Sequence, residues 1–260
     1  MPHTSRKRTP HHQHKRLQVT DDSGWTHVTT SGKSARQVLR TTLPQESQSH
    51  PFLPAEAPSR LTQEELQQQL QRCRQRWEDS DTWKVVEETL RSWGMAVDDG
   101  IVCIGMGSPS GFLRGGWVDR RSVSMYQLAG LMSIVDWMRR THPNVNVYAQ
   151  DPVLNAHDKF LLLSLGINVL EHPDAFEKVS PATFLYCPGA EQTHLVQLLA
   201  SNPAFLFGGP LEDIESETVR QFVKTKGSTR LPRFEDHEHA FWNMRLYYPA
   251  DLAGNKSDRE

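Results

Sequence analysis

Cysteine is scarce in this chain of 260 residues, which contains only Cys73, Cys103 and Cys187 and no CxxC pair. This scarcity argues against a disulfide-stabilised scaffold and against a structural zinc site, and it is typical of a reducing compartment. No apolar run approaches the ~20 residues that a membrane-spanning helix needs. No apolar stretch follows the charged N-terminal residues, so we expect no secretory signal. We therefore expect a protein of the cytoplasm, the nucleus or both, with no membrane partner.

The chain also lacks an excess of charge of one sign. Its formal net charge is −2, so composition gives no support for a nucleic-acid partner of the folded part. Two basic clusters, Arg6-Lys7-Arg8 and Lys15-Arg16, lie near the N-terminus. They have the composition of a nuclear-import signal or a nucleic-acid-binding arm. We favour the simpler interpretation of a solvated tail, and we expect no nucleic-acid partner.

Large apolar side chains are few in residues 1–60, and the apolar content of the whole chain is 37%. A segment of this kind cannot bury enough apolar surface to offset the entropy lost on ordering. We therefore predict a disordered basic and polar tail over residues 1–60, a folded domain over residues 61–248 and a polar tail over residues 249–260.

The first part of the predicted domain, residues 61–93, is a helical N-terminal extension. Thr62 and Glu65 have the spacing of a capping box, which predicts a helix start. Apolar residues then recur at spacings of four, three and four, as expected for one buried helix face. These residues are Leu66, Leu70, Cys73 and Trp77.

Beyond residue 100, short apolar strands alternate with helices. Strands are predicted at residues 101–104, 145–149, 167–170, 183–187 and 204–207, with a strand-like aromatic segment at 240–248. Helices are predicted to start near Ser124 and to cover about 154–164, 191–200 and 211–225. In the helix at 154–164 we expect Phe160, Leu161 and Leu163 to face the core. Such alternation predicts an α/β fold: a three-layer, Rossmann-like arrangement with a mainly parallel sheet and helices on both faces.

Small or polar residues follow these strands abruptly. Gly105, Gly107 and Ser108 come after the first strand, and Asp151-Pro152 comes after the second. Cys187-Pro188 ends the fourth strand in the same way. The carboxyl ends of parallel strands meet at one edge of a sheet, where open α/β folds bind their ligands. The sequence therefore predicts a ligand crevice at this edge.

Two of these features allow a structural interpretation as well. Gly105 and Gly107 form half of a dinucleotide-binding fingerprint, but Ser110 stands where its third glycine belongs. They suit either close approach of a ligand or a tight turn with positive φ. Asp151 has the topological position of the acid that accepts hydrogen bonds from ribose hydroxyls. It is equally suited to cap the following helix, and both alternatives stay open.

Other motifs are better explained without a binding role. We interpret Cys187 as a small core residue rather than a nucleophile. We expect His237-Glu238-His239 to be an exposed loop rather than a metal site, and His157-Asp158 to lie on the surface. The loop of residues 108–122 carries three arginines among its glycines, and we favour a mobile insertion over an anion-holding lid. These arginines are Arg114, Arg120 and Arg121.

Several short motifs together resemble the sensitivity-to-red-light-reduced family. They span about residues 80 to 247, and their order and spacing carry the resemblance. The motifs are Ile104-Gly105-Met106-Gly107-Ser108, Gln127-Leu128, Asp151-Pro152, Leu165-Gly166-Ile167, Cys187-Pro188 and Ala240-Phe241-Trp242-Asn243. The chain departs from the family pattern at Pro188-Gly189-Ala190, where the family typically has Pro-His-Cys, and at Gly208-Gly209-Pro210, where it tends to have Gly-Asn-Ser. It therefore resembles a divergent member.

The resemblance implies a Rossmann-like domain and a regulatory role, because the family is linked to circadian and light signalling and to the regulation of haem biosynthesis. It implies no particular cofactor or catalytic residue. We therefore predict a non-catalytic regulatory protein with a protein partner. The alternative is an enzyme that binds a nucleotide-like small molecule or S-adenosylmethionine, such as a methyltransferase. The predicted ligand-binding residues are Gly105, Gly107, Ser108, Gln127, Asp151, Pro152, Cys187, Pro188 and Gly208.

Overall fold

The computed structural model describes residues 17–20, 26–29, 53–93, 100–112 and 119–252. The chain divides into two compact units, residues 1–51 and 52–260. In the first unit, β1 (Leu17–Thr20) and β2 (Thr26–Thr29) form an antiparallel pair. Most of the predicted tail over residues 1–60, and most of the predicted tail over residues 249–260, lies outside the described residues.

The ordered part of the second unit starts earlier than the predicted boundary near Leu61. Ala55 is buried, and its N–H donates to the carbonyl of Val153 at 2.8 Å. Glu56 and Phe112 form an antiparallel bridge. Composition missed this segment because its order comes from backbone hydrogen bonds to distant residues rather than from its own apolar side chains.

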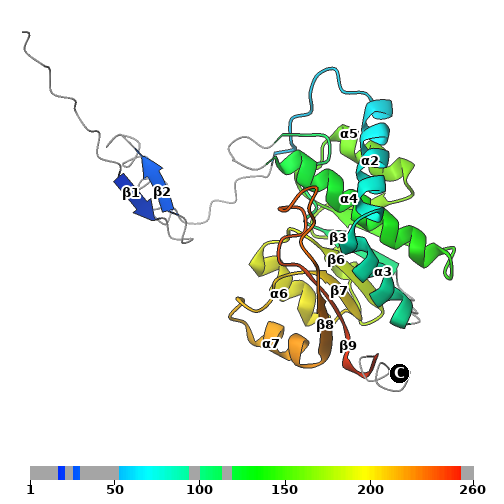
Figure 1. Cartoon of the computed structure of the whole chain (residues 1–260), viewed down its shortest axis with the longest axis vertical. Coiled ribbons are helices and arrows are strands. Elements are labelled where there is room, and N and C mark those ends of the chain that lie inside the picture. Colours follow the sequence, from blue (N-terminus) through cyan, green and yellow to red (C-terminus); the bar gives the residue numbers. More distant parts are fainter. Residues whose placement is uncertain (1–16, 21–25, 30–52, 94–99, 113–118, 253–260) are drawn as a thin grey trace, which may run out of the picture. The chain divides into compact units, whose positions relative to one another are not determined.

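The helical extension forms as predicted, with α2 at Gln63–Glu78 and α3 at Asp81–Trp93. Thr62 and Glu65 make both hydrogen bonds of the capping box. Leu66, Leu70 and Trp77 are buried on one face of α2, and α2 packs along α4 (Arg120–Arg139; Figure 1). No helix in the described part of the chain is long and apolar enough to cross a membrane.

Seven strands of the second unit form one sheet in the described residues, and the fold is the predicted α/β class. The strands are β3 (Gly100–Ile104), β4 (Val147–Gln150), β5 (Asn168–Val169), β6 (Thr183–Cys187), β7 (Phe205–Gly208), β8 (Lys226–Arg230) and β9 (Arg245–Pro249). Their order across the sheet is β5-β4-β3-β6-β7-β9-β8. The first five run parallel, and β9 is antiparallel to both β7 and β8. The order reverses between β4 and β6, on either side of β3, which makes this the topological switch point.

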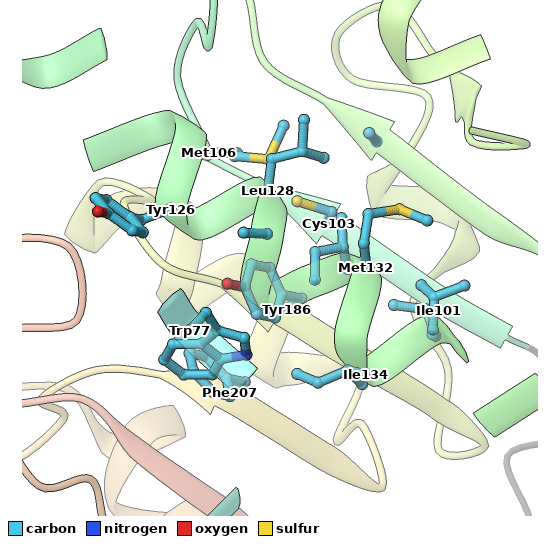
Figure 2. Packing of buried hydrophobic residues seen from close by; sticks show 14 of the residues in the cluster. Trp77, Ile101, Cys103, Met106, Tyr126, Leu128, Met132, Ile134, Tyr186 and Phe207 are labelled. Carbon is cyan, nitrogen blue, oxygen red and sulfur yellow. The ribbon is translucent and has the colours of Figure 1, made fainter. Parts of the chain in front are cut away.

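Helices cover both faces of the sheet, so the fold has three layers (Figure 1). Ile101 and Cys103 belong to one core cluster, with residues of α2, α4 and α5 (Ala156–Ser164). Val102 and Ile104 belong to the other, with α6 (Gln192–Ala200) and α7 (Glu217–Lys224). Figure 2 shows the first cluster, where Cys103, Leu128, Met132 and Tyr186 lie together. Because successive strand residues point to opposite faces, a strand buried on both faces is apolar throughout.

Three predicted details are wrong. The helix α4 begins at Arg120, before Ser124, because Asp119 caps it by accepting the N–H of Ser122 at 3.1 Å. On α5, Phe160 and Leu163 are 58% and 59% exposed, whereas Leu161 and the unpredicted Leu162 are buried. The run of four consecutive apolar residues gives no periodicity by which to choose a face.

The C-terminal strands also differ from the prediction of one strand-like segment at residues 240–248. Only its last residues belong to β9, whereas residues 238–243 form turns. The edge strand β8 was missed, because its sequence Lys-Gly-Ser-Thr-Arg has no buried side chain and pairs only with β9 among the described strands. An edge strand of polar residues lacks the apolar signal on which strand prediction relies.

Candidate functional site

A cavity of about 420 Å³ lies at the carboxyl ends of β3, β4 and β6, beside the first turns of α4. Seven of the nine predicted ligand-binding residues lie at this edge of the sheet and line this cavity or the one beside it. The main cavity is lined by Gly105, Gly107, Ser108, Gln127, Asp151 and Pro188, together with Met106, Gly111, Arg120, Val123, Ser124, Val153, Gly189, Glu191 and His239. The adjoining cavity adds Pro152. The sheet topology therefore brings together residues from four separate stretches of sequence.

The turn after β3 requires its glycines. Gly105 and Gly107 have φ angles of +77° and +76°, a region that residues with a Cβ atom rarely adopt. A Cβ atom on Gly105 would also lie 2.5 Å from the backbone nitrogen of Ala190. The tight-turn interpretation of the two glycines is therefore correct, and the close approach of this turn to the end of β6 helps to shape the crevice.

Asp151 connects the ends of β3 and β4. Its Oδ2 accepts the N–H of Gly107 at 2.7 Å, and its Oδ1 accepts the N–H of Val153 at 3.0 Å. Burial raises the pKa of this carboxyl above its ordinary value, and the two backbone hydrogen bonds oppose that shift. A carboxylate has about four acceptor positions, so each oxygen retains one for a ligand in the cavity that it lines. The cap of α5 is Asn155, not Asp151.

Asp158, which we predicted to lie on the surface, is fully buried. Its carboxylate accepts the hydroxyl of Ser108 at 2.5 Å, the N–H of Ser110 at 2.8 Å and the N–H of Asn155 at 3.0 Å. It thereby holds the loop after β3 against the start of α5. The signal was present in the sequence, because Asn155 and Asp158 have the spacing of a capping box and form one.

Two of the polar residues in the cavity wall are held by the protein itself. The Nε2 of Gln127 donates to the carbonyl of Ala240 at 2.9 Å, and the carbonyl of Gln127 accepts the hydroxyl of Tyr186 at 2.8 Å. Ser108 donates to Asp158. Their side chains therefore fix the shape of the wall, which makes the site rigid around Asp151.

Cys187 and Gly208 do not line the cavity. They face each other in the register between β6 and β7, and Cys187 is buried in the second core cluster. Burial raises the pKa of its thiol to about 12, so the thiolate needed for nucleophilic attack is absent at neutral pH. The interpretation of Cys187 as a core residue is therefore confirmed.

Arg120, Glu191 and His239 line the cavity although sequence reasoning did not assign them to it. His239 belongs to the predicted exposed loop, and its side chain is 52% exposed. The rings of His237 and His239 are 6.2 Å apart, and no group of three metal-ligating side chains occurs in the described ranges. No pattern distinguishes these cavity residues, because only the tertiary fold brings them to the crevice.

The loop of residues 108–122 is only partly described, and Arg114 lies outside the described residues. Arg120 and Arg121 are the first residues of α4 rather than loop residues. Arg121 points away from the crevice, because it donates to the carbonyl of Pro109 and to the Oε1 of Gln69. That residues 108–122 form a mobile insertion rather than an anion-holding lid stays a prediction.

The geometry provides a concave site lined by a carboxylate, which can accept hydrogen bonds from hydroxyl groups. Comparison with known proteins agrees with the sequence motifs. The family model of the SRR1 domain, the sensitivity-to-red-light-reduced family, matches residues 66–248, which is most of the chain. No curated protein matches the sequence.

Proposed function

This chain belongs to the SRR1 domain family, and on that premise we propose that it is a regulatory protein whose crevice binds a ribose-containing small molecule. The ligand would place its ribose against Asp151, and its binding would control an interaction with a protein partner. The regulatory part of the proposal comes from the roles with which the family is associated. The binding part comes from the geometry of the crevice.

The position of Asp151 is the observation that carries the binding proposal. It follows the strand next to β3 and lines the cavity at the switch point of the sheet. In nucleotide-binding sheets an acid in this position accepts hydrogen bonds from the ribose. In nucleotide-binding sheets this acid usually follows the glycines by ~20 residues, whereas Asp151 follows Gly107 by 44. The two residues are nevertheless in direct hydrogen-bond contact.

Covalent catalysis by cysteine is disfavoured. Cys187 is the cysteine nearest to the crevice in sequence, but its thiol is buried and its pKa is raised to about 12. A catalytic thiol needs an exposed position and a lowered pKa. This supports binding, rather than nucleophilic chemistry, as the role of the site.

Methyl transfer is the second candidate function, and the sheet supports it. In the sheet β3 lies beside β4, and Gly107 and Asp151 line one cavity at their carboxyl ends. Nucleotide-like cofactors bind in such a crevice at the switch point of an α/β sheet. Fold analogy alone does not establish a reaction, so transfer of a labelled methyl group from S-adenosylmethionine to a cell extract is the discriminating assay.

Thermal unfolding with candidate ligands tests the binding proposal. We expect S-adenosylmethionine, NAD or ATP to raise the melting temperature, because a ligand at ~100 times its Kd stabilises by about 2.7 kcal/mol. The Asp151→Asn variant should remain folded and lose that rise, whereas Asp213→Asn, at an exposed position outside the crevice, should keep it. The absence of a rise with all three compounds and with adenosine would contradict the proposal.

A further inference from the structure

A second, smaller cavity of about 160 Å³ adjoins the crevice on the side of β4. The two cavities share five lining residues, Gly105, Asp151, Val153, Gly189 and Glu191. A group bound at Asp151 would therefore face both spaces. Three ring-bearing residues from two segments line the smaller cavity, and sequence reasoning did not single them out as site residues.

These three rings form a cluster. His172 and Phe176 come from the segment after β5, and His194 comes from α6. The Phe176 ring lies edge-on to both histidines, with centroids 5.5 Å away in each case. The two histidine rings are 5.7 Å apart. Flat aromatic surfaces of this kind stack on nucleobases, and they do so with any base because every base has a π face.

The buried side chain of Gln150 fixes the orientation and the tautomer of His172. Its Oε1 accepts the N–H of Ala175 at 2.9 Å, so its Nε2 faces the Nδ1 of His172 at 3.1 Å. An amide nitrogen can only donate, so Nδ1 accepts and Nε2 carries the proton of the neutral ring. His172 can therefore offer one N–H donor to a heterocycle that has acceptor nitrogens.

The turn after β3 is a poor phosphate site, although its glycines resemble one. The N–H of Gly107 already donates to the Asp151 carboxylate at 2.7 Å. The N–H of Ser110 donates to Asp158, and that of Gly111 donates to the Ser108 hydroxyl. Phosphate-binding loops use free N–H groups of this kind. Here these three N–H groups already have acceptors within the protein.

The charges around the two cavities lead to the same conclusion. Among the described residues that line them, Asp151 and Glu191 are acidic, and Arg120 is the one lysine or arginine. Phosphate groups would meet more negative than positive charge in this crevice. A neutral nucleoside, or one with a cationic substituent, would not be repelled by this excess of negative charge.

We propose that the ligand of this site is a nucleoside without phosphate groups, whose base stacks in the cavity of His172, Phe176 and His194 while its ribose binds Asp151. This inference rests on the proposed function and narrows its ligand class.

Isothermal titration calorimetry of the full chain with adenosine and with AMP tests this assignment. We expect adenosine to bind at least about tenfold more tightly than AMP, which corresponds to about 1.4 kcal/mol. Phe176→Ala should weaken adenosine binding about tenfold or more, and Phe176→Leu should also weaken it, because leucine fills the space but has no π face. Phe160→Ala, which removes an exposed ring outside both cavities, should have no effect.

The outcomes separate this inference from the proposed function. If adenosine, S-adenosylmethionine, NAD and ATP all fail to bind the wild-type chain, both are wrong. If a ribose-containing ligand binds and Asp151→Asn weakens it, but Phe176→Leu does not, the assignment of the base is wrong and the proposed function stands. If AMP or ATP binds as tightly as adenosine, the exclusion of phosphate is wrong. Circular dichroism of each variant establishes that it is folded.

Discussion

At the scale of single residues, the buried carboxylate of Asp158 is the most consequential finding that the sequence analysis missed. It accepts three hydrogen bonds and has no cationic partner among the described residues. A buried carboxylate is costly unless hydrogen bonds satisfy it, and here two of the three come from Ser108 and Ser110, in the loop that forms one wall of the crevice. The fold of that loop therefore depends on a residue that does not line the cavity.

We expect Asp158→Asn to destabilise the protein by about 1–3 kcal/mol, because the amide nitrogen would face an N–H donor and leave a buried group unpaired. Urea unfolding measures this loss. The same substitution at the exposed Asp213 should change the free energy of unfolding by less than about 0.5 kcal/mol. Equal effects at the two positions would show that the network around Asp158 contributes nothing.

Cys187 gives a prediction about alkaline pH. Its pKa is raised from 9.0 to about 12 in the folded chain, so between these values the unfolded chain loses the thiol proton while the folded chain keeps it. The contribution of the thiol to stability is fully present below pH 9 and is lost as the pH rises towards 12. At about pH 10 the loss from this thiol is about 1.4 kcal/mol.

Urea unfolding between about pH 8 and pH 10 measures that slope. Cys187→Ala should flatten it by about 1.4 kcal/mol, whereas Cys73→Ala, at a half-exposed thiol, should flatten it less. An unchanged slope in the Cys187 variant would mean that this thiol is not shielded from water.

At the scale of elements, strands were easier to predict than helix faces. The strands β3, β4, β6 and β7 are apolar over most of their length and end at glycine, proline or a polar residue, so both their positions and their ends could be predicted. Helix α5 has Phe160 to Leu163 in succession, and such a run leaves its buried face undefined. Only packing against the sheet decides that Leu161 and Leu162 point inward.

A matched pair of substitutions on α5 checks this assignment. Leu161→Ala removes a side chain with no exposed surface and should cost about 2–5 kcal/mol of stability. Leu163→Ala makes the same chemical change at a side chain that is 59% exposed and should cost less than about 1 kcal/mol. Chemical denaturation of both variants gives the comparison, and a larger cost at Leu163 would reverse the assigned face.

At the scale of the whole molecule, the fold class followed from the alternation of strands and helices, but the strand order did not. The polar edge strand β8 and the antiparallel placement of β9 depend on pairing between distant residues, which no local pattern encodes. The site could be predicted only in part, because some of its residues are marked by a local pattern and others are not. Glycines and Asp151 at strand ends were visible in the sequence, whereas His239, Glu191 and the ring cluster reach the crevice only through the tertiary fold.

Ligand binding at the edge formed by β3, β4 and β6 is the central proposal for this protein. Nuclear magnetic resonance of the chain labelled with ¹⁵N-glycine tests this directly, with adenosine as the probe. Gly105, Gly107 and Gly189 line the crevice, while Gly166 and Gly227 line neither of its two cavities. We expect saturable shifts of the first three amide signals and none of the other two. Unchanged signals from Gly105 and Gly107 at saturating adenosine, or shifts confined to Gly166 and Gly227, would show that the ligand does not bind at this edge.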